Sequence, residues 1–176
     1  MKSLAWLVML FAVSSTCLFA AEKMSNAEIV QLLITPKALV QVNAKRVEIS
    51  PEVKLLCAPP KEEDIKTHRQ LVAGKTAFVN VFVTPGGVDA MQDRPAVFPV
   101  GTVILKQKFP TATSKTTELY TGMLKREPGY NPDCGDWEFF TLSGNGKVVT
   151  ARGKIDSCIE CHKEYPKTDF VTKEYR

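Results

Sequence analysis

Short runs of β-branched and aromatic residues recur through the second half of the chain and predict a β-sheet. Five segments carry the pattern, namely residues 77–83, 101–109, 118–125, 136–142 and 147–152. The last two are joined by Ser143-Gly144-Asn145-Gly146, and Asn-Gly is typical of a β-hairpin turn. Because the links between the segments are short, we expect the strands to pair in antiparallel fashion.

Helical signals stand at the two sequence ends of this strand-rich region. Ser25 and Glu28 have capping-box spacing before a run of apolar residues, and predict a short helix that ends before Pro36. Asp156 and Ser157 are residue types that cap helices, and predict a second short helix. The predicted fold class is therefore α+β, a predominantly antiparallel β-sheet with short helices at its N- and C-terminal ends.

The first residues have the pattern of a cleaved secretory signal peptide. Lys2 precedes an apolar run over residues 4–13, and small residues follow at Ala20 and Ala21. The run is short for crossing a bilayer, which favours cleavage over a retained membrane anchor. We therefore predict a signal peptide over residues 1–21 and export to the periplasm.

The mature chain divides by pattern into two parts. Residues 22–60 are interrupted by prolines and are too few for a domain of their own, so we expect an N-terminal extension packed on the rest. Residues 39–49 within it alternate loosely and are expected to form a strand. Residues 61–176 are then the main domain.

Charge and composition exclude some classes of function. The net charge is +4, and the lysines are scattered without an arginine-rich block, which argues against a nucleic-acid partner. Hydrophobic residues make up 44% of the chain, which suits one folded domain with its own core.

The run Cys158-Ile159-Glu160-Cys161-His162 is the pattern that attaches a c-type haem. Each thiol adds across a vinyl group of the porphyrin, and the histidine that follows becomes the proximal ligand of the iron. Half of a zinc site is the alternative, but it requires further closely spaced ligands, and the only other histidine is His68. We therefore predict one covalently bound haem c per chain, held by Cys158, Cys161 and His162.

Three further cysteines remain. Cys17 falls in the predicted signal peptide, which leaves Cys57 and Cys134 in the mature chain. In an oxidising compartment such a pair often forms a disulfide, and two separate buried thiols are the alternative. Spacing alone does not decide between them.

The opposite side of the iron has several candidate ligands. An electron-carrying haem usually has a second strong ligand, often Met or His, and the candidates are Met91, Met123 and His68. Met123 lies in a predicted strand, where core packing is the alternative, and His68 lies in a polar stretch. If none of them reaches the iron, the site is open to nitric oxide, hydroxylamine or peroxide.

Four segments in order resemble the cytochrome P-460 family, small periplasmic haem proteins in which a lysine is joined covalently to the porphyrin. They are residues 101–106 (GTVILK), 121–130 (TGMLKREPGY), 135–140 (GDWEFF) and 158–171 (CIECHKE followed by KTDFV). The resemblance covers residues 62–176 and implies a β-sheet with flanking helices, usually in a homodimer. It also implies that Cys158 and Cys161 attach the haem and that His162 binds the iron.

By the same resemblance, Lys106 matches the lysine that is cross-linked to the porphyrin. A bond to the macrocycle edge would distort it and change its electronics. On the residues alone, Lys106 shares parity with Lys108 on its strand, and a solvent-facing lysine is the alternative.

The chain departs from the family pattern at one position. Hydroxylamine-oxidising members place a carboxylate over the iron, on the strand after the lysine strand, where it takes protons from a bound substrate. Here Thr121 occupies that place, and Glu118 has the opposite parity on the same strand. Asp133, Asp136 and Glu127 lie in or beside the next loop.

The resemblance implies a haem enzyme that oxidises hydroxylamine or handles related nitrogen oxides at an open distal site, with a soluble redox partner. One alternative is a haem protein that binds nitric oxide or another gas without turnover, which the missing carboxylate favours. The other is an electron-transfer cytochrome c with a six-coordinate iron.

Overall fold

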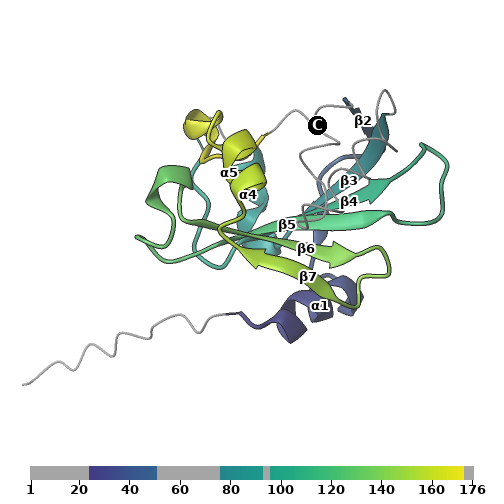
Figure 1. Cartoon of the computed structure of the whole chain (residues 1–176), viewed down its shortest axis with the longest axis horizontal. Helices are drawn as coiled ribbons and strands as arrows, with labels where there is room; N and C mark the ends of the chain where they lie inside the picture. The colour runs from purple at the N-terminus through teal and green to yellow at the C-terminus, as the bar shows by residue number, and fades with distance from the viewer. Residues whose placement is uncertain (1–23, 51–75, 93–95, 173–176) are drawn as a thin grey trace, which may run out of the picture.

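The computed structural model describes residues 24–50, 76–92 and 96–172, and these form one antiparallel sheet with short helices on both faces (Figure 1). The strands run in the order β1-β3-β4-β5-β6-β7, and β2 pairs with β3 beside β1. Their bounds are β1 (Val40–Gln41), β2 (Val47–Ile49), β3 (Ala77–Val83), β4 (Val103–Phe109), β5 (Leu119–Lys125), β6 (Trp137–Ser143) and β7 (Val149–Gly153). From β3 to β7 each strand pairs with its neighbour in sequence, as short links require, and the predicted α+β class is confirmed.

The helices cover opposite faces of the sheet. Helix α1 (Asn26–Ile34) packs on one face, while α4 (Val88–Gln92) and α5 (Asp156–His162) lie on the other (Figure 1). Three 3₁₀ turns, η1 (Pro85–Gly87), η2 (Pro132–Cys134) and η3 (Pro166–Thr168), complete the described elements. Helix α4 was not predicted, because five residues are too few to show a helical period.

The cap of α1 agrees with the sequence prediction. The backbone N–H of Glu28 donates to Ser25 Oγ at 3.2 Å, and the backbone N–H of Ser25 donates to Glu28 Oε2 at 2.6 Å. At α5 the cap prediction is wrong, since the N-cap residue is Ile155 and no side chain caps the helix. Asp156 instead stands in the first turn, where its charge suits the positive end of the helix dipole.

The strand predicted over residues 39–49 is split into β1 and β2. The side chain of Asn43 takes over the pairing between them, because its Oδ1 accepts from the Val81 N–H at 2.7 Å and its Nδ2 donates to Val79 O at 3.0 Å. A side chain thus replaces the backbone ladder at this point of the sheet. The predicted hairpin between β6 and β7 is confirmed, with Gly146 at φ +70° and its N–H donating to Ser143 O.

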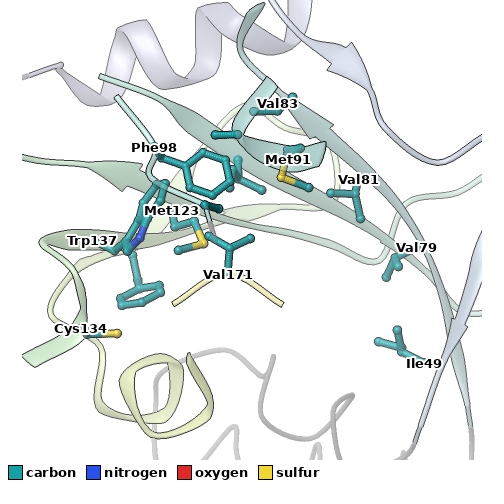
Figure 2. Packing of buried hydrophobic residues seen from close by; sticks show 14 of the residues in the cluster. Ile49, Val79, Val81, Val83, Met91, Phe98, Met123, Cys134, Trp137 and Val171 are labelled. Atoms are coloured by element: carbon teal, nitrogen blue, oxygen red, sulfur yellow. The ribbon is translucent and has the colours of Figure 1, made fainter. Parts of the chain in front are cut away.

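Two apolar clusters flank the sheet, and alternation along each strand decides which side chain joins which. The cluster on the α5 face contains Val79, Val81, Val83, Phe139 and Trp137. Figure 2 shows Phe98 and Met123 beside Trp137, and Met91 near Val81. The α1 face cluster is formed by Ile29, Val103, Leu105, Leu124, Phe140 and Leu142. The parity of Phe139 and Trp137 therefore places both on the side of α5.

The N-terminal part joins the sheet as far as the structure describes it. Strands β1 and β2 both pair with β3, and α1 lies on the opposite face from α5. The predicted signal peptide over residues 1–21 lies outside the described residues, and the boundaries at 22–60 and 61–176 stay predictions. No helix within the described ranges combines the length and apolar character needed to cross a membrane.

Candidate functional site

His162 ends α5 and turns its ring onto the sheet. The ring lies against Phe139 of β6, with centroids 5.1 Å apart and planes inclined at 44°. On its other edge, Nδ1 lies 2.7 Å from the carbonyl oxygen of Phe170. A carbonyl only accepts, so the hydrogen bond fixes the tautomer with the proton on Nδ1 and leaves the Nε2 lone pair available for a metal.

The surroundings keep this imidazole neutral. Burial lowers the pKa of His162 to about 4, the hydrogen bond to Phe170 acts in the opposite direction, and the positive charge of Lys106 lowers the pKa further. A neutral imidazole with a free ring nitrogen is the form that binds iron.

Lys106 lies in the middle of β4, on the same face as His162. It pairs in register with Val81 of β3 and Thr121 of β5, and its side chain is partly buried. Ile104, two positions before it on β4, belongs to the α5-face cluster that also contains Phe139, the residue against the His162 ring. Lys108, which shares the parity of Lys106, is 1% exposed and pairs with Glu118 at 3.2 Å.

Cys158 and Cys161 lie on α5 with the histidine. Positions three and four apart on a helix share one side, so both thiols and the imidazole project from the same side of α5. Cys158 and Ile159 pack against the apolar cluster of the α5 face, and both cysteines are partly buried. Two thiols, a neutral imidazole and an apolar wall suit a haem, whose macrocycle is apolar and whose iron takes a nitrogen ligand.

A comparison with protein families bears on the cofactor. The model of the family described as Cytochrome P460 matches residues 60–173. The chain belongs to the cytochrome P460 family. Membership implies a haem cofactor with its iron, so the P460 chain is a cytochrome. A search of the curated proteins gave no match.

A row of side chains crosses the sheet beside Lys106 in this P460 domain. The row is Val81, Lys106, Thr121, Thr141 and Ala151, each in register with the next. Thr121, the residue that the resemblance aligns with the carboxylate position, is part of this row, and Thr141 Oγ1 lies 2.7 Å from Thr150 Oγ1. Within the described part of the chain, this row contains no carboxylate.

The carboxylates considered from the sequence have other places. Glu118 lies just before β5, and its ion pair is with Lys108. Asp136 Oδ1 accepts the backbone N–H groups of Gly129 and Asn131 at 3.0 and 2.8 Å, which shapes the turn before β6. Asp133 and Glu127 are exposed.

The candidate second ligands are buried in the core or lie outside the described residues. Met91 and Met123 are 3% and 4% exposed, and Figure 2 shows both side chains in the apolar cluster with Phe98 and Val83. Met123 pairs in register with Ile104 and Phe139, so it packs as part of the sheet's α5 face. His68 lies outside the described residues.

Cys134 lies fully buried in η2. Burial raises the pKa of its thiol to about 11, the charge of Asp169 acts in the same direction, and Lys125 opposes it. Its proposed partner Cys57 lies outside the described residues, so a Cys57–Cys134 disulfide stays a prediction.

The sequence reasoning missed the group that orients His162, the carbonyl of Phe170. Every residue has a backbone carbonyl, so the sequence contains no signal for this one. A second omission is Asp169, whose carboxylate pairs with Lys125 of β5 at 2.7 Å. The available signal was the run KTDFV in the family resemblance, which places an aspartate beside Phe170.

Proposed function

We propose that this P460 chain is a periplasmic mono-haem c-type cytochrome that oxidises hydroxylamine, or handles related nitrogen oxides, at an open distal iron site. The observation that carries the proposal is the placement of Lys106 and His162 on one face of the sheet, with the histidine Nδ1 held by Phe170. Family membership supplies the haem, and these residues supply a ligand and a candidate cross-link.

The proposal assigns covalent attachment of one haem c to Cys158 and Cys161. Their side chains project from the side of α5 that also bears His162, whose Nε2 would bind the iron. The bound haem would supply an iron that exchanges electrons and binds small nitrogen oxides. Phe139 and the apolar cluster of the α5 face exclude water on the protein side of the site.

Lys106 is the proposed cross-linking residue. It stands on a central strand of the sheet, where its backbone is held by hydrogen-bonded neighbours on both sides. A rigid strand fixes the approach of the amine to the macrocycle edge better than a loop would. The cross-link would change the haem spectrum and potential, because distortion of the macrocycle is one way a protein tunes a haem.

Gas binding without turnover is the second candidate, and Thr121 favours it. The hydroxyl in register with Lys106 donates or accepts a hydrogen bond but does not take protons near neutral pH. A site with this residue would hold nitric oxide and lack the base that substrate oxidation uses.

The absorption spectrum of the reduced protein, matured with c-type attachment machinery, tests the proposal first. A strongly red-shifted Soret band in the wild type, replaced by an ordinary c-type spectrum in Lys106→Ala, supports the cross-link. Lys147→Ala is the control, because Lys147 is exposed and its substitution should leave the wild-type spectrum unchanged. Hydroxylamine consumption by wild type but not by Lys106→Ala supports the enzyme. Tight nitric oxide binding with no hydroxylamine consumption selects the gas-binding candidate, and absence of covalent haem overturns both.

The same proposal includes export through the signal peptide, assembly into a homodimer, and electron exchange with a soluble redox partner. Cell fractionation checks the first, and sedimentation of the haem-loaded protein checks the second. A protein that stays in the cytoplasm would contradict export, because c-type haem attachment in bacteria takes place outside it.

A further inference from the structure

Asp169 sits at the centre of a group of hydrogen bonds next to His162. The Nζ of Lys125 donates to both carboxylate oxygens at 2.7 Å, and the backbone N–H of Phe98 donates to Oδ2 at 2.8 Å. The indole Nε1–H of Trp137 donates to the Asp169 carbonyl at 2.7 Å. Three separate segments of the fold, β5, β6 and the segment before β4, therefore hold this one residue.

Asp169 and the residue after it, Phe170, form a turn with an unusual backbone conformation. Asp169 and Phe170 have φ values of +53° and +61°, and each left-handed residue other than glycine costs about 1 kcal/mol. Beyond the contacts to Asp169, the Phe170 N–H donates to Tyr165 O at 2.8 Å. The conformation persists because these contacts determine it, and it turns the Phe170 carbonyl toward the His162 ring.

The pairing between Lys125 and Asp169 is shielded from solvent. Their side chains are 12% and 11% exposed, and Lys125 also donates to Gly135 O at 2.7 Å. Gly135 leaves room for the turn, since a Cβ there would lie 2.5 Å from the Phe170 ring. An ion pair with this burial and several hydrogen bonds is held in one geometry more firmly than an exposed pair.

We propose that the Lys125–Asp169 ion pair is a positioning element for the axial histidine. It fixes the Phe170 carbonyl against the Nδ1–H of His162, and so sets how strongly Nε2 donates to the iron. A hydrogen bond at Nδ1 raises the basicity of a ligating imidazole, which stabilises the oxidised metal. The inference rests on the proposed attachment of haem at His162.

The test compares two aspartates of the same conformation in the haem-loaded protein. Asp169→Asn keeps the size and the left-handed preference but removes the charge that holds Lys125. Asp136→Asn is the matched control, because Asp136 has φ +57° and its carboxylate binds only backbone N–H groups of its own turn among the contacts described. The measurements are the midpoint potential and the Fe–His stretching frequency of the reduced protein.

The expected result is a higher midpoint potential and a lower Fe–His frequency in Asp169→Asn, with both unchanged in Asp136→Asn. Lys125→Gln should shift both quantities in the same direction, and it decides the question if Asp169→Asn does not fold. Equal shifts in the control, or no shift in either test variant, would overturn the proposal. If the wild type carries covalent haem but neither variant shifts the midpoint potential or the Fe–His frequency, this inference alone is refuted. If the wild type carries no covalent haem, both the proposed function and this inference are refuted.

Discussion

Thr121 lies directly opposite Lys106 in the β4–β5 pair, so its side chain is next to that lysine on the α5 face. Directly opposed residues have Cβ atoms about 5 Å apart, close enough for both to act on one bound molecule. A base at position 121 would therefore have access to a molecule held beside Lys106.

Thr121→Glu should raise hydroxylamine oxidation by about 100-fold, the lower range for a positioned general base. The carboxylate would accept protons that threonine does not take. Turnover with a chemical electron acceptor measures the effect. Thr121→Gln, which has a similar size without a base, should stay at the wild-type rate, and equal gains in both variants would contradict the base argument.

Met91→Leu and Met123→Leu should each leave the visible spectrum of the haem protein unchanged. Both side chains lie in the apolar cluster, so a volume-conserving substitution should cost less than about 1.5 kcal/mol of stability. Rapid carbon monoxide binding to the reduced wild type should accompany this result. Loss of a six-coordinate spectrum in either variant would instead identify that methionine as a ligand and select the electron-transfer cytochrome.

Gly122→Ala should destabilise the fold by about 1–3 kcal/mol through overpacking. A Cβ at this position of β5 would lie 2.2 Å from the Phe140 ring on the neighbouring strand. Urea unfolding measures the change in the free energy of unfolding. Gly86→Ala is the control, because nothing lies within 4 Å of a Cβ there, and Phe140→Leu should recover part of the loss in the double variant.

Glu138 should make stability depend on pH. Its side chain lies 3% exposed on the α1 face between Arg126 at 2.6 Å and Arg152 at 3.0 Å. Burial alone would raise the pKa of this carboxyl, but hydrogen bonds from Arg152 and Arg126 outweigh it and hold the pKa below the ordinary 4.5. The stabilisation is therefore complete above pH 4.5 and is lost as the pH falls through the lowered value.

Glu138→Gln should accordingly cost about 3 kcal/mol at pH 7, because it leaves two arginines without their buried partner. The difference from wild type should shrink as the pH falls below 4.5. Urea unfolding at neutral and acidic pH checks this, with exposed Glu127→Gln as the control. A difference that does not change with pH would contradict the ion-pair origin of the effect.

The strands and α1 were predictable because their signals are local. Alternation, turn residues and the capping box of Ser25 and Glu28 act within a few positions of the chain. The split between β1 and β2 was not predictable, since Asn43 replaces the ladder only when β3 lies beside it. Long-range contacts of this kind have no local sequence signal.

The candidate site also has features with a local sequence signal and features that depend on long-range contacts. The spacing of Cys158, Cys161 and His162 is local, and so the donor set was predicted from the sequence, as was Lys106 from the resemblance. The Phe170 carbonyl depends on a left-handed turn held by Lys125, a residue 44 positions from Asp169. The parity given to Glu118 did not apply, because Glu118 lies just before β5 and pairs with Lys108.

The position of α5 after all the strands has a consequence for the order of assembly. Synthesis begins at the N-terminus, so β1 to β7 leave the ribosome before Cys158 does. The pairings of β3 through β7 are between sequence neighbours and need no residue of α5. The strand pairings are thus independent of Cys158, Cys161 and His162, which stand on α5 after the whole sheet.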